Sequence, residues 1–296
     1  MIKDYWIILK PELTLLSVFT ATMSAYLAIP TNELFINIYP ILLNVTLATF
    51  LLGGSAAILN QLLEINLDSL MKRTENRPLV KNRISKKVAW IYAFVLGISG
   101  VLISYYSLSN LAFIFGIFTI ISYVVFYTPI KRLSVFSTII GAIPGALPPV
   151  IGWTAVTNSI DAETWILFAI LFLWQIPHFY SLGWMYRKDY ERANFKILPV
   201  TDQKGSSLSL QVLFNVLLIF PISLLPAVVE LASIEYFYSM IVVGIIFIFY
   251  GVRFSFSLLN KGDEEVVKIN RSARHLFYAT LIYLPLLFLF LAIWKI

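Results

Sequence analysis

The sequence predicts an all-α, polytopic membrane protein with nine transmembrane helices. Of its 296 residues, 59% are hydrophobic, and the mean hydropathy is +0.83. A soluble chain of this length does not carry so much apolar surface, whereas a chain that crosses a bilayer several times does. The absence of cysteine excludes disulfides and thiolate metal sites.

Nine apolar runs are long enough to span a membrane. They lie at 13–30, 37–59, 88–107, 110–128, 135–156, 163–182, 208–229, 236–258 and 276–294. The residues before the first run resemble neither a cleaved signal nor a transit peptide, and they predict a short amphipathic lead-in. We therefore expect the plasma membrane of a prokaryote.

The distribution of positive charge predicts the orientation of these helices. With the N-terminus in the cytoplasm, 21 of the 22 Lys and Arg residues fall on the inner side, and only Lys295 lies outside. The two longest inner loops, 61–87 and 183–207, then lie on the same side of the membrane. The net charge of +6 is explained by the positive residues of the inner loops, so we expect no nucleic-acid partner.

One polar stretch follows the second apolar run. Asn60, Glu64 and Asp68 are spaced i, i+4 and i+8, which places them on one helical face over about 12 Å. Two carboxylates and an amide suit Mg²⁺, which takes its remaining ligands from water and substrate phosphates. Arg73 and Arg77 follow, and arginines suit a diphosphate. The simpler interpretation is a hydrated polar helix end in the headgroup layer.

A second polar cluster begins at the inner end of the sixth run. It contains His178, Tyr180, Lys188 and Asp189. His178 is either a structural histidine or a group that contacts the acceptor or acts as an acid or base. Asp189 is either a second metal ligand or half of a surface ion pair with Lys188 or Arg192.

The fifth run is interrupted by three prolines and three glycines between residues 141 and 152. Irregular backbone at membrane depth is tolerated where it is buried in protein or lines a cavity, so we expect a bulky apolar ligand there. Just before it, Tyr123 and Tyr127 precede Lys131 and Arg132. These two cations either contact a diphosphate or serve only the positive-inside rule.

These motifs resemble the UbiA superfamily of intramembrane prenyltransferases, and within it the haem-modifying branch. The likeness covers about residues 10 to 205. Its first motif is matched by Asn60, Asp68, Met71, Arg73, Thr74, Arg77, Pro78 and Leu79. Branch-like motifs include Tyr127-Thr-Pro-x-Lys131-Arg132, the Gly/Pro-rich run, and Trp174-Gln-x-Pro-His178-Phe followed by Asp189-Tyr190. The chain departs at Glu64, where the superfamily has Asp, and at Asn66, where many haem-branch members have Asp.

The resemblance implies one prenyltransferase domain over 1–296, with loops 61–87 and 183–207 as a catalytic cap and nine helices around a central cavity. It implies Mg²⁺ dependence, farnesyl diphosphate as donor and haem b as acceptor, with farnesyl and water added to a vinyl group. The residues expected to hold the metal are Asn60, Glu64, Asp68 and Asp189. The other expected site residues are Arg73, Arg77, Lys131, Arg132, Tyr123, Tyr127, His178, Tyr180 and Lys188. Candidate protein partners are a haem A synthase and a terminal-oxidase assembly.

Two other functions remain open from the sequence. A sister prenyltransferase would act on a quinone precursor, a chlorophyll-type ring or a lipid glycerol, and it would not need the His178 cluster. A transporter typically carries polar groups near the bilayer midplane on broken helices. Only the run at 135–156 fits that pattern, because the acidic motifs lie at inner helix ends.

Overall fold

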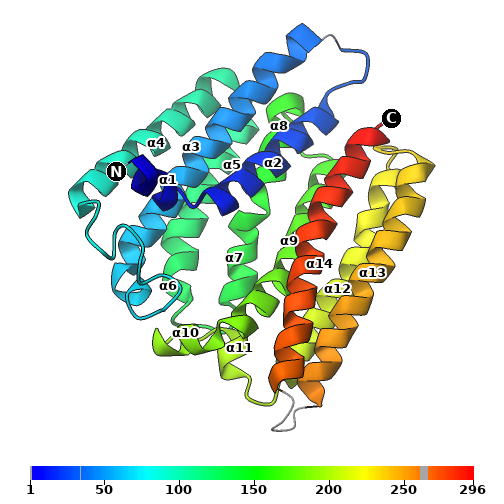
Figure 1. Ribbon diagram of the computed structural model, residues 1–296. Coiled ribbons are helices and arrows are strands. Elements are labelled where there is room, and N and C mark those ends of the chain that lie inside the picture. The colour runs from blue at the N-terminus through cyan, green and yellow to red at the C-terminus, as the bar shows by residue number, and fades with distance from the viewer. Residues whose placement is uncertain (1, 34, 261–265) are drawn as a thin grey trace. The chain divides into compact units, whose positions relative to one another are not determined.

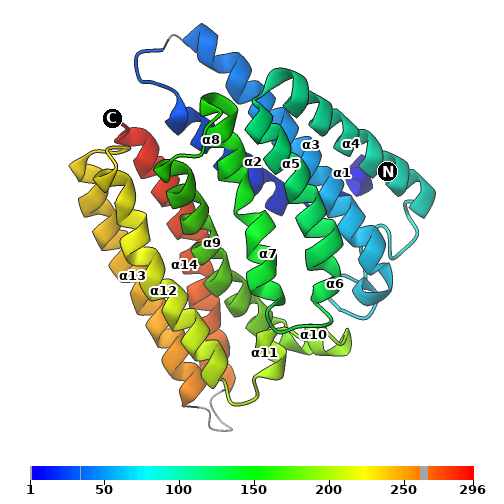
Figure 2. The same ribbon diagram turned by 180° about the vertical axis from the view of Figure 1, so that it is seen from behind.

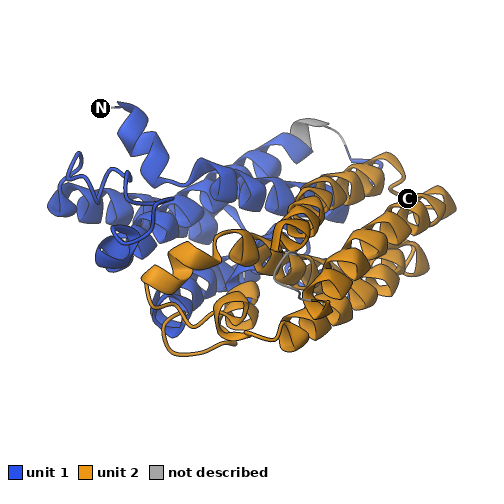
Figure 3. Cartoon of the chain, turned by 60° about the horizontal axis from the view of Figure 1, so that its bottom comes forward, with its two compact units in different colours: residues 1–130, 143–164 blue, residues 131–142, 165–296 orange. Residues whose placement is uncertain are grey.

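The computed structural model describes residues 2–33, 35–260 and 266–296, and within these ranges it contains helices and no named strand. The predicted all-α class is therefore confirmed. Figure 3 shows that the chain forms two compact units. Unit 1 holds residues 1–130 and 143–164, and unit 2 holds 131–142 and 165–296. The prediction of one domain over 1–296 with a catalytic cap stays a prediction.

The described residues contain eight helices long and apolar enough to cross a membrane. The number becomes nine when α1 (Ile2–Ile8) and α2 (Pro11–Ala28), which meet at an angle of 59°, count as one bent span. Each of the nine predicted runs corresponds to one of these spans. The cytoplasmic N-terminus and the central cavity stay predictions.

Unit 1 is built around the longest helix, α3 (Phe35–Asp68). Figures 1 and 2 both show α4 (Lys86–Ser107) lying alongside it. Small residues let the two helices approach, since a Cβ on Gly100 would lie 2.9 Å from the Leu52 side chain. The unit continues with α5 (Asn110–Ile121), the π-helix η1 (Ser122–Tyr127) and α6 (Thr128–Ile130).

The predicted interruption of the fifth run is confirmed. The helix breaks at Ala146, between α7 (Ser137–Gly145) and α8 (Leu147–Thr157). Pro148 and Pro149 follow the break in the first turn of α8, where a missing backbone N–H costs least. Helix α8 packs on α2, and the Ser24 hydroxyl donates to the Pro149 carbonyl over 2.7 Å.

Unit 2 contains α9 (Ala162–Met185) from Trp165 onward, followed by two short helices and a three-helix bundle. The short helices are α10 (Arg187–Arg192) and α11 (Leu198–Thr201). The bundle, side by side in Figures 1 and 2, is α12 (Ser206–Val228), α13 (Ile234–Leu259) and α14 (Val266–Ile293). Two buried tyrosines join the three helices, because the hydroxyls of Tyr236 on α13 and Tyr283 on α14 both donate to Ser223 on α12.

Several predicted helix boundaries differ from the structure, among them the start of the last helix, which was expected at 276 and lies at Val266. The second run was expected to end at residue 59, but α3 continues to Asp68 because its last three turns bury polar side chains that hydropathy does not count. The fourth run was expected as one helix to residue 128. Its α-helical geometry ends at Ile121 and a π-helical turn follows, and such turns are frequent at functional sites.

Substitution of Gly152 tests the packing of α8 on α2. A Cβ at this position would lie 1.9 Å from the Ala21 carbonyl oxygen, which is backbone and cannot move alone. We expect Gly152→Ala to lower the melting temperature in detergent by about 5 °C or more, from an overpacking cost of about 2–3 kcal/mol. Gly116→Ala is the matched control, because the nearest atom at 3.0 Å belongs to the flexible Leu52 side chain. Equal melting temperatures for both variants would contradict the close helix contact.

Candidate functional site

The last three turns of α3 carry a buried polar face. Asn60 is 0% exposed, Glu64 is 6% exposed and Asp68 is 2% exposed. Burying an ionised carboxylate is costly unless it is paired or binds a cation. The predicted single face is confirmed, and it is removed from solvent more completely than a hydrated helix end would be.

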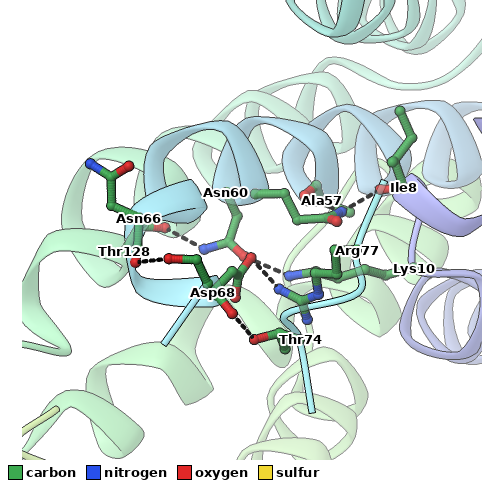
Figure 4. Close-up of polar contacts among 11 residues, drawn as sticks. Ile8, Lys10, Ala57, Asn60, Asn66, Asp68, Thr74, Arg77 and Thr128 are labelled. Atoms are coloured by element: carbon green, nitrogen blue, oxygen red, sulfur yellow. Dashed lines mark hydrogen bonds and ion pairs between the residues drawn. The ribbon is translucent and has the colours of Figure 1, made fainter. Parts of the chain in front are cut away.

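Asn60 joins three elements of unit 1, as Figure 4 shows. The Lys10 ammonium donates to Asn60 Oδ1 over 2.6 Å. Asn60 Nδ2 donates to the Thr128 hydroxyl over 3.2 Å, and that hydroxyl donates to the Tyr123 carbonyl over 2.9 Å. The Tyr123 carbonyl thus accepts from both the backbone N–H and the hydroxyl of Thr128, and the hydroxyl ties the π-helical turn to the polar face.

Asp68 organises the loop that follows α3. Its carboxylate accepts from Arg77 Nη1 over 2.6 Å, and its backbone carbonyl accepts from the Thr74 hydroxyl over 2.8 Å. Met71 and Leu79 are buried, and Leu79 packs in a cluster with Ile8 and Ile58. The motif thus has two parts. Buried apolar side chains hold the loop in place, and the loop positions the Arg77 guanidinium at Asp68.

Sequence reasoning assigned Lys10 only to membrane topology and missed its place in this cluster. Lys10 lies at the corner between α1 and α2 in the left-handed conformation, with φ 48°, which is uncommon for a non-glycine residue. The Gln61 amide fixes the corner by donating to the Ile8 carbonyl over 2.6 Å. The signal in the sequence was a lysine directly before a proline at a helix start.

The oxygens of this face suit a divalent cation. Two cationic side chains already contact it, the Lys10 ammonium at Asn60 and the Arg77 guanidinium at Asp68. Among the described residues, no group of three or more His, Cys, Asp and Glu could hold a metal. The face itself offers only two carboxylates and an amide. This set fits Mg²⁺ if water and phosphate oxygens complete the coordination.

The remaining predicted residues of unit 1 differ in exposure. Arg73 is exposed in the loop, whereas Tyr123 and Tyr127 are half-buried on η1. Their ring centroids lie 5.3 Å apart, so they form one aromatic pair beside Thr128. Thr128 contacts Asn60 and also binds the Tyr123 carbonyl, so the turn that carries both tyrosines is joined to the Asn60 end of the polar face.

In unit 2, His178 is buried and held on three sides. Its ring stacks on Trp174 and on Phe277, with centroids 5.0 and 4.9 Å away. Its Nδ1 lies 2.8 Å from the Thr280 hydroxyl, which donates its only proton to the Phe277 carbonyl. When that hydroxyl donates to the Phe277 carbonyl, it accepts from Nδ1–H, and Nε2 of the neutral ring then carries the lone pair.

The other predicted residues of unit 2 lie in the second half of α9, on α10 and in the segment before α7. Tyr180 is 1% exposed and belongs to the packed core. Asp189 is buried and pairs with Arg192 over 3.2 Å, so one of its two predicted ion pairs is present. Lys188 is exposed beside it. Lys131 is half-buried and its carbonyl accepts from the Lys196 amide over 3.1 Å, whereas Arg132 is exposed.

Comparison with known proteins identifies the family. The model of the UbiA prenyltransferase family matches residues 17–268. The chain belongs to the UbiA prenyltransferase family. A protein of Opitutus terrae named protoheme IX farnesyltransferase is 37% identical over 96% of this chain and 92% of its own. One of the same name from Solibacter usitatus is 35% identical over 97% and 96%.

Solved structures support the same fold. A digeranylgeranylglyceryl phosphate synthase gives a TM-score of 0.74 at 16% identity, covering 98% of both chains. A UbiA homolog from Archaeoglobus fulgidus bound to GPP and Mg²⁺ gives 0.63 at 16% identity, covering 95% of this chain and 99% of its own. The family model and the named relatives show that the chain is a multi-pass membrane prenyltransferase, so the alternative of a transporter does not hold.

Neutralising Asp68 tests whether the acidic face serves catalysis. We expect Asp68→Asn to lower prenyl transfer by about 100-fold or more, because a metal ion supplies several kcal/mol of charge stabilisation that the neutral amide would no longer hold. The amide keeps the shape of the side chain, so melting in detergent should change little. Release of diphosphate from a prenyl diphosphate measures the rate.

The matched control is Asp4→Asn, which breaks the 2.9 Å ion pair of Asp4 with Arg83 in the same unit. This variant should keep its activity. A loss of the same size in both variants would assign the effect to a broken ion pair and would remove Asp68 from the catalytic machinery.

Proposed function

We propose that this chain transfers a farnesyl group from farnesyl diphosphate to a vinyl group of haem b, with addition of water, and releases haem O and diphosphate. The observation that carries the proposal is the full-length similarity to proteins named protoheme IX farnesyltransferase, at 37% identity over 96% of the chain. The buried polar face of α3 and the aromatic surroundings of His178 supply chemistry for the two substrates.

On the donor side, we assign Asn60, Glu64, Asp68 and Asp189 as metal ligands. A bound Mg²⁺ would neutralise charge on the diphosphate and orient it. Arg73, Arg77, Lys131 and Arg132 would contact the diphosphate oxygens and stabilise the charge that builds on the leaving group. Arg77 is already placed at the acidic face by its contact with Asp68. Asp189, Lys131 and Arg132 join the proposal through their charge and the family motif.

On the acceptor side, aromatic and polar groups would position the allylic cation and the porphyrin. The electron-rich faces of Tyr123 and Tyr127 attract a cation, and their pairing holds both rings in place. The Nε2 lone pair of His178 can contact the acceptor or accept a proton. Lys188 and Tyr180 complete the proposed acceptor set.

The proposed reaction joins the farnesyl carbon to the vinyl carbon of haem. The carbon–oxygen bond of farnesyl diphosphate breaks, and its electron pair leaves with the diphosphate. The vinyl π electrons form the new carbon–carbon bond, which moves the positive charge to the carbon next to the ring. A water oxygen bonds to that carbon and loses a proton. Apolar surroundings keep water from the cation until the new bond has formed.

We further propose that the catalytic face is cytoplasmic, on the basis of the 21 inner Lys and Arg residues. Farnesyl and porphyrin are apolar, which accounts for a reaction located in the bilayer. A haem A synthase or a terminal-oxidase assembly would be a suitable partner, since either would consume the product. The location prediction of a prokaryotic cell membrane agrees with the bacterial source of the relatives.

A product assay tests the proposal directly. Purified protein in detergent is given haem b, farnesyl diphosphate and Mg²⁺, with EDTA as the control, and the pigments are analysed by mass spectrometry. We expect a metal-dependent gain of farnesyl plus water on haem. If no pigment changes but diphosphate is released with a hydroxybenzoate or naphthoate acceptor, the chain is a sister prenyltransferase and the haem assignment is wrong.

The role of His178 can be tested separately. We expect His178→Ala to raise KM for haem by about tenfold, since a hydrogen bond or iron contact from the imidazole is lost, while KM for farnesyl diphosphate stays the same. The matched control is His275→Ala, the only other histidine of the chain, which lies on α14 of the same unit. An unchanged KM for haem in His178→Ala would contradict the acceptor role.

A further inference from the structure

Unit 2 contains a polar cavity of about 290 Å³ at the inner end of α9. It is lined by Met185, Arg187, Lys188 and Asp189 from one side and by Val266 and Asn270 of α14 from the other. Pockets for drug-sized ligands measure about 300–1,000 Å³, so this cavity suits one polar arm of a larger molecule.

Arg187 is the fixed cation of this cavity. Its Nη1 donates to the Asn270 side chain over 3.1 Å and to the Trp184 carbonyl over 3.0 Å. Its guanidinium carbon lies 4.5 Å from the centroid of the Trp184 ring, in a cation–π contact. Both hydrogen bonds use the same nitrogen, so the guanidinium keeps further N–H donors for a planar anion such as a carboxylate.

The charges around Arg187 favour an added anion. Burial lowers the pKa of the Arg187 guanidinium and Glu191 opposes that shift, but an arginine remains charged in either case. Among the described residues that line the cavity, the acidic one is Asp189, which has its own cation in Arg192. Lys188 adds a second positive charge to the lining.

The cavity lies on the same helical faces as His178. On α9, Met185 follows His178 by seven residues, two turns that return to nearly the same direction. On α14, Asn270 precedes Phe277 by seven residues, and Phe277 stacks on His178. The cavity therefore lies two turns from the His178 ring along both helices, on the faces of α9 and α14 that meet where His178 stacks on Phe277.

We infer that this cavity binds a propionate carboxylate of the porphyrin acceptor through Arg187. The inference rests on the proposed function, because it takes haem b as the acceptor. A porphyrin with a propionate in the cavity would extend along α9 and α14 toward His178, two turns away. Arg187 would then be a residue that selects acceptors with a free carboxylate.

The test compares haem b with its dimethyl ester, in which both propionates are capped. Binding is measured first without donor, by titrating each porphyrin into the protein in detergent and following its absorbance; turnover follows with farnesyl diphosphate. We expect the wild type to bind and prenylate haem b at least about tenfold better than the ester, as fits loss of one charged hydrogen-bonded contact. In Arg187→Gln this preference should vanish, with KM for farnesyl diphosphate unchanged.

Two variants serve as controls. Arg271→Gln removes an exposed arginine next to Asn270 and should keep the preference for haem b. Asn270→Leu keeps the charge of Arg187 but removes the hydrogen bond from Arg187 to Asn270, so it should weaken the preference for haem b. This variant replaces Arg187→Gln in the test if Arg187→Gln does not fold.

The outcomes separate this inference from the proposed function. If the wild type prenylates haem b and the ester equally well, the carboxylate site is wrong while the haem activity stands. If Arg187→Gln instead raises KM for farnesyl diphosphate, the cavity serves the diphosphate and the inference is overturned. If the wild type modifies neither porphyrin, the proposed function itself has failed.

Discussion

Burial of the polar face of α3 is the constraint on which the rest of unit 1 depends. Asn60, Glu64 and Asp68 are buried away from water, so their polar atoms need partners within the protein. The compensating groups come from three separate elements. Lys10 comes from the α1–α2 corner, where its backbone is left-handed. Thr128 comes from the start of α6, and Arg77 comes from the loop after Asp68.

The same constraint links structure to chemistry. A face that needs cations to be stable is also a face that can exchange a side-chain cation for a metal ion and its diphosphate. In the structure the ammonium of Lys10 and the guanidinium of Arg77 contact oxygens that we assign to the metal. Both cations would then be next to the substrate, where they could contact phosphate oxygens. Lys10 thus lies at the same polar face as the residues of the family motif.

Much of this arrangement could be predicted from sequence, because it follows local rules. Apolar length gave the nine spans, helical periodicity placed Asn60, Glu64 and Asp68 on one face, and the prolines around residue 148 located the break in the fifth span. What could not be predicted depends on contacts between distant residues. Lys10 and Asn60 are 50 residues apart, and the Thr280 hydroxyl that fixes the His178 ring is 102 residues away. The π-helical turn was missed because its hydrophobic residues fit an α-helix equally well.

The most direct test of the central claim is Mn²⁺ binding to the purified protein, followed by electron paramagnetic resonance in place of Mg²⁺. A farnesyl thiodiphosphate that cannot react keeps the donor site filled without turnover. We expect the wild type and Asp4→Asn to bind Mn²⁺ only when this analogue is present. We expect Glu64→Gln and Asp68→Asn to lose this binding, so that the spectrum shows free Mn²⁺. Binding of equal strength in Asp68→Asn would show that the acidic face of α3 does not hold the metal.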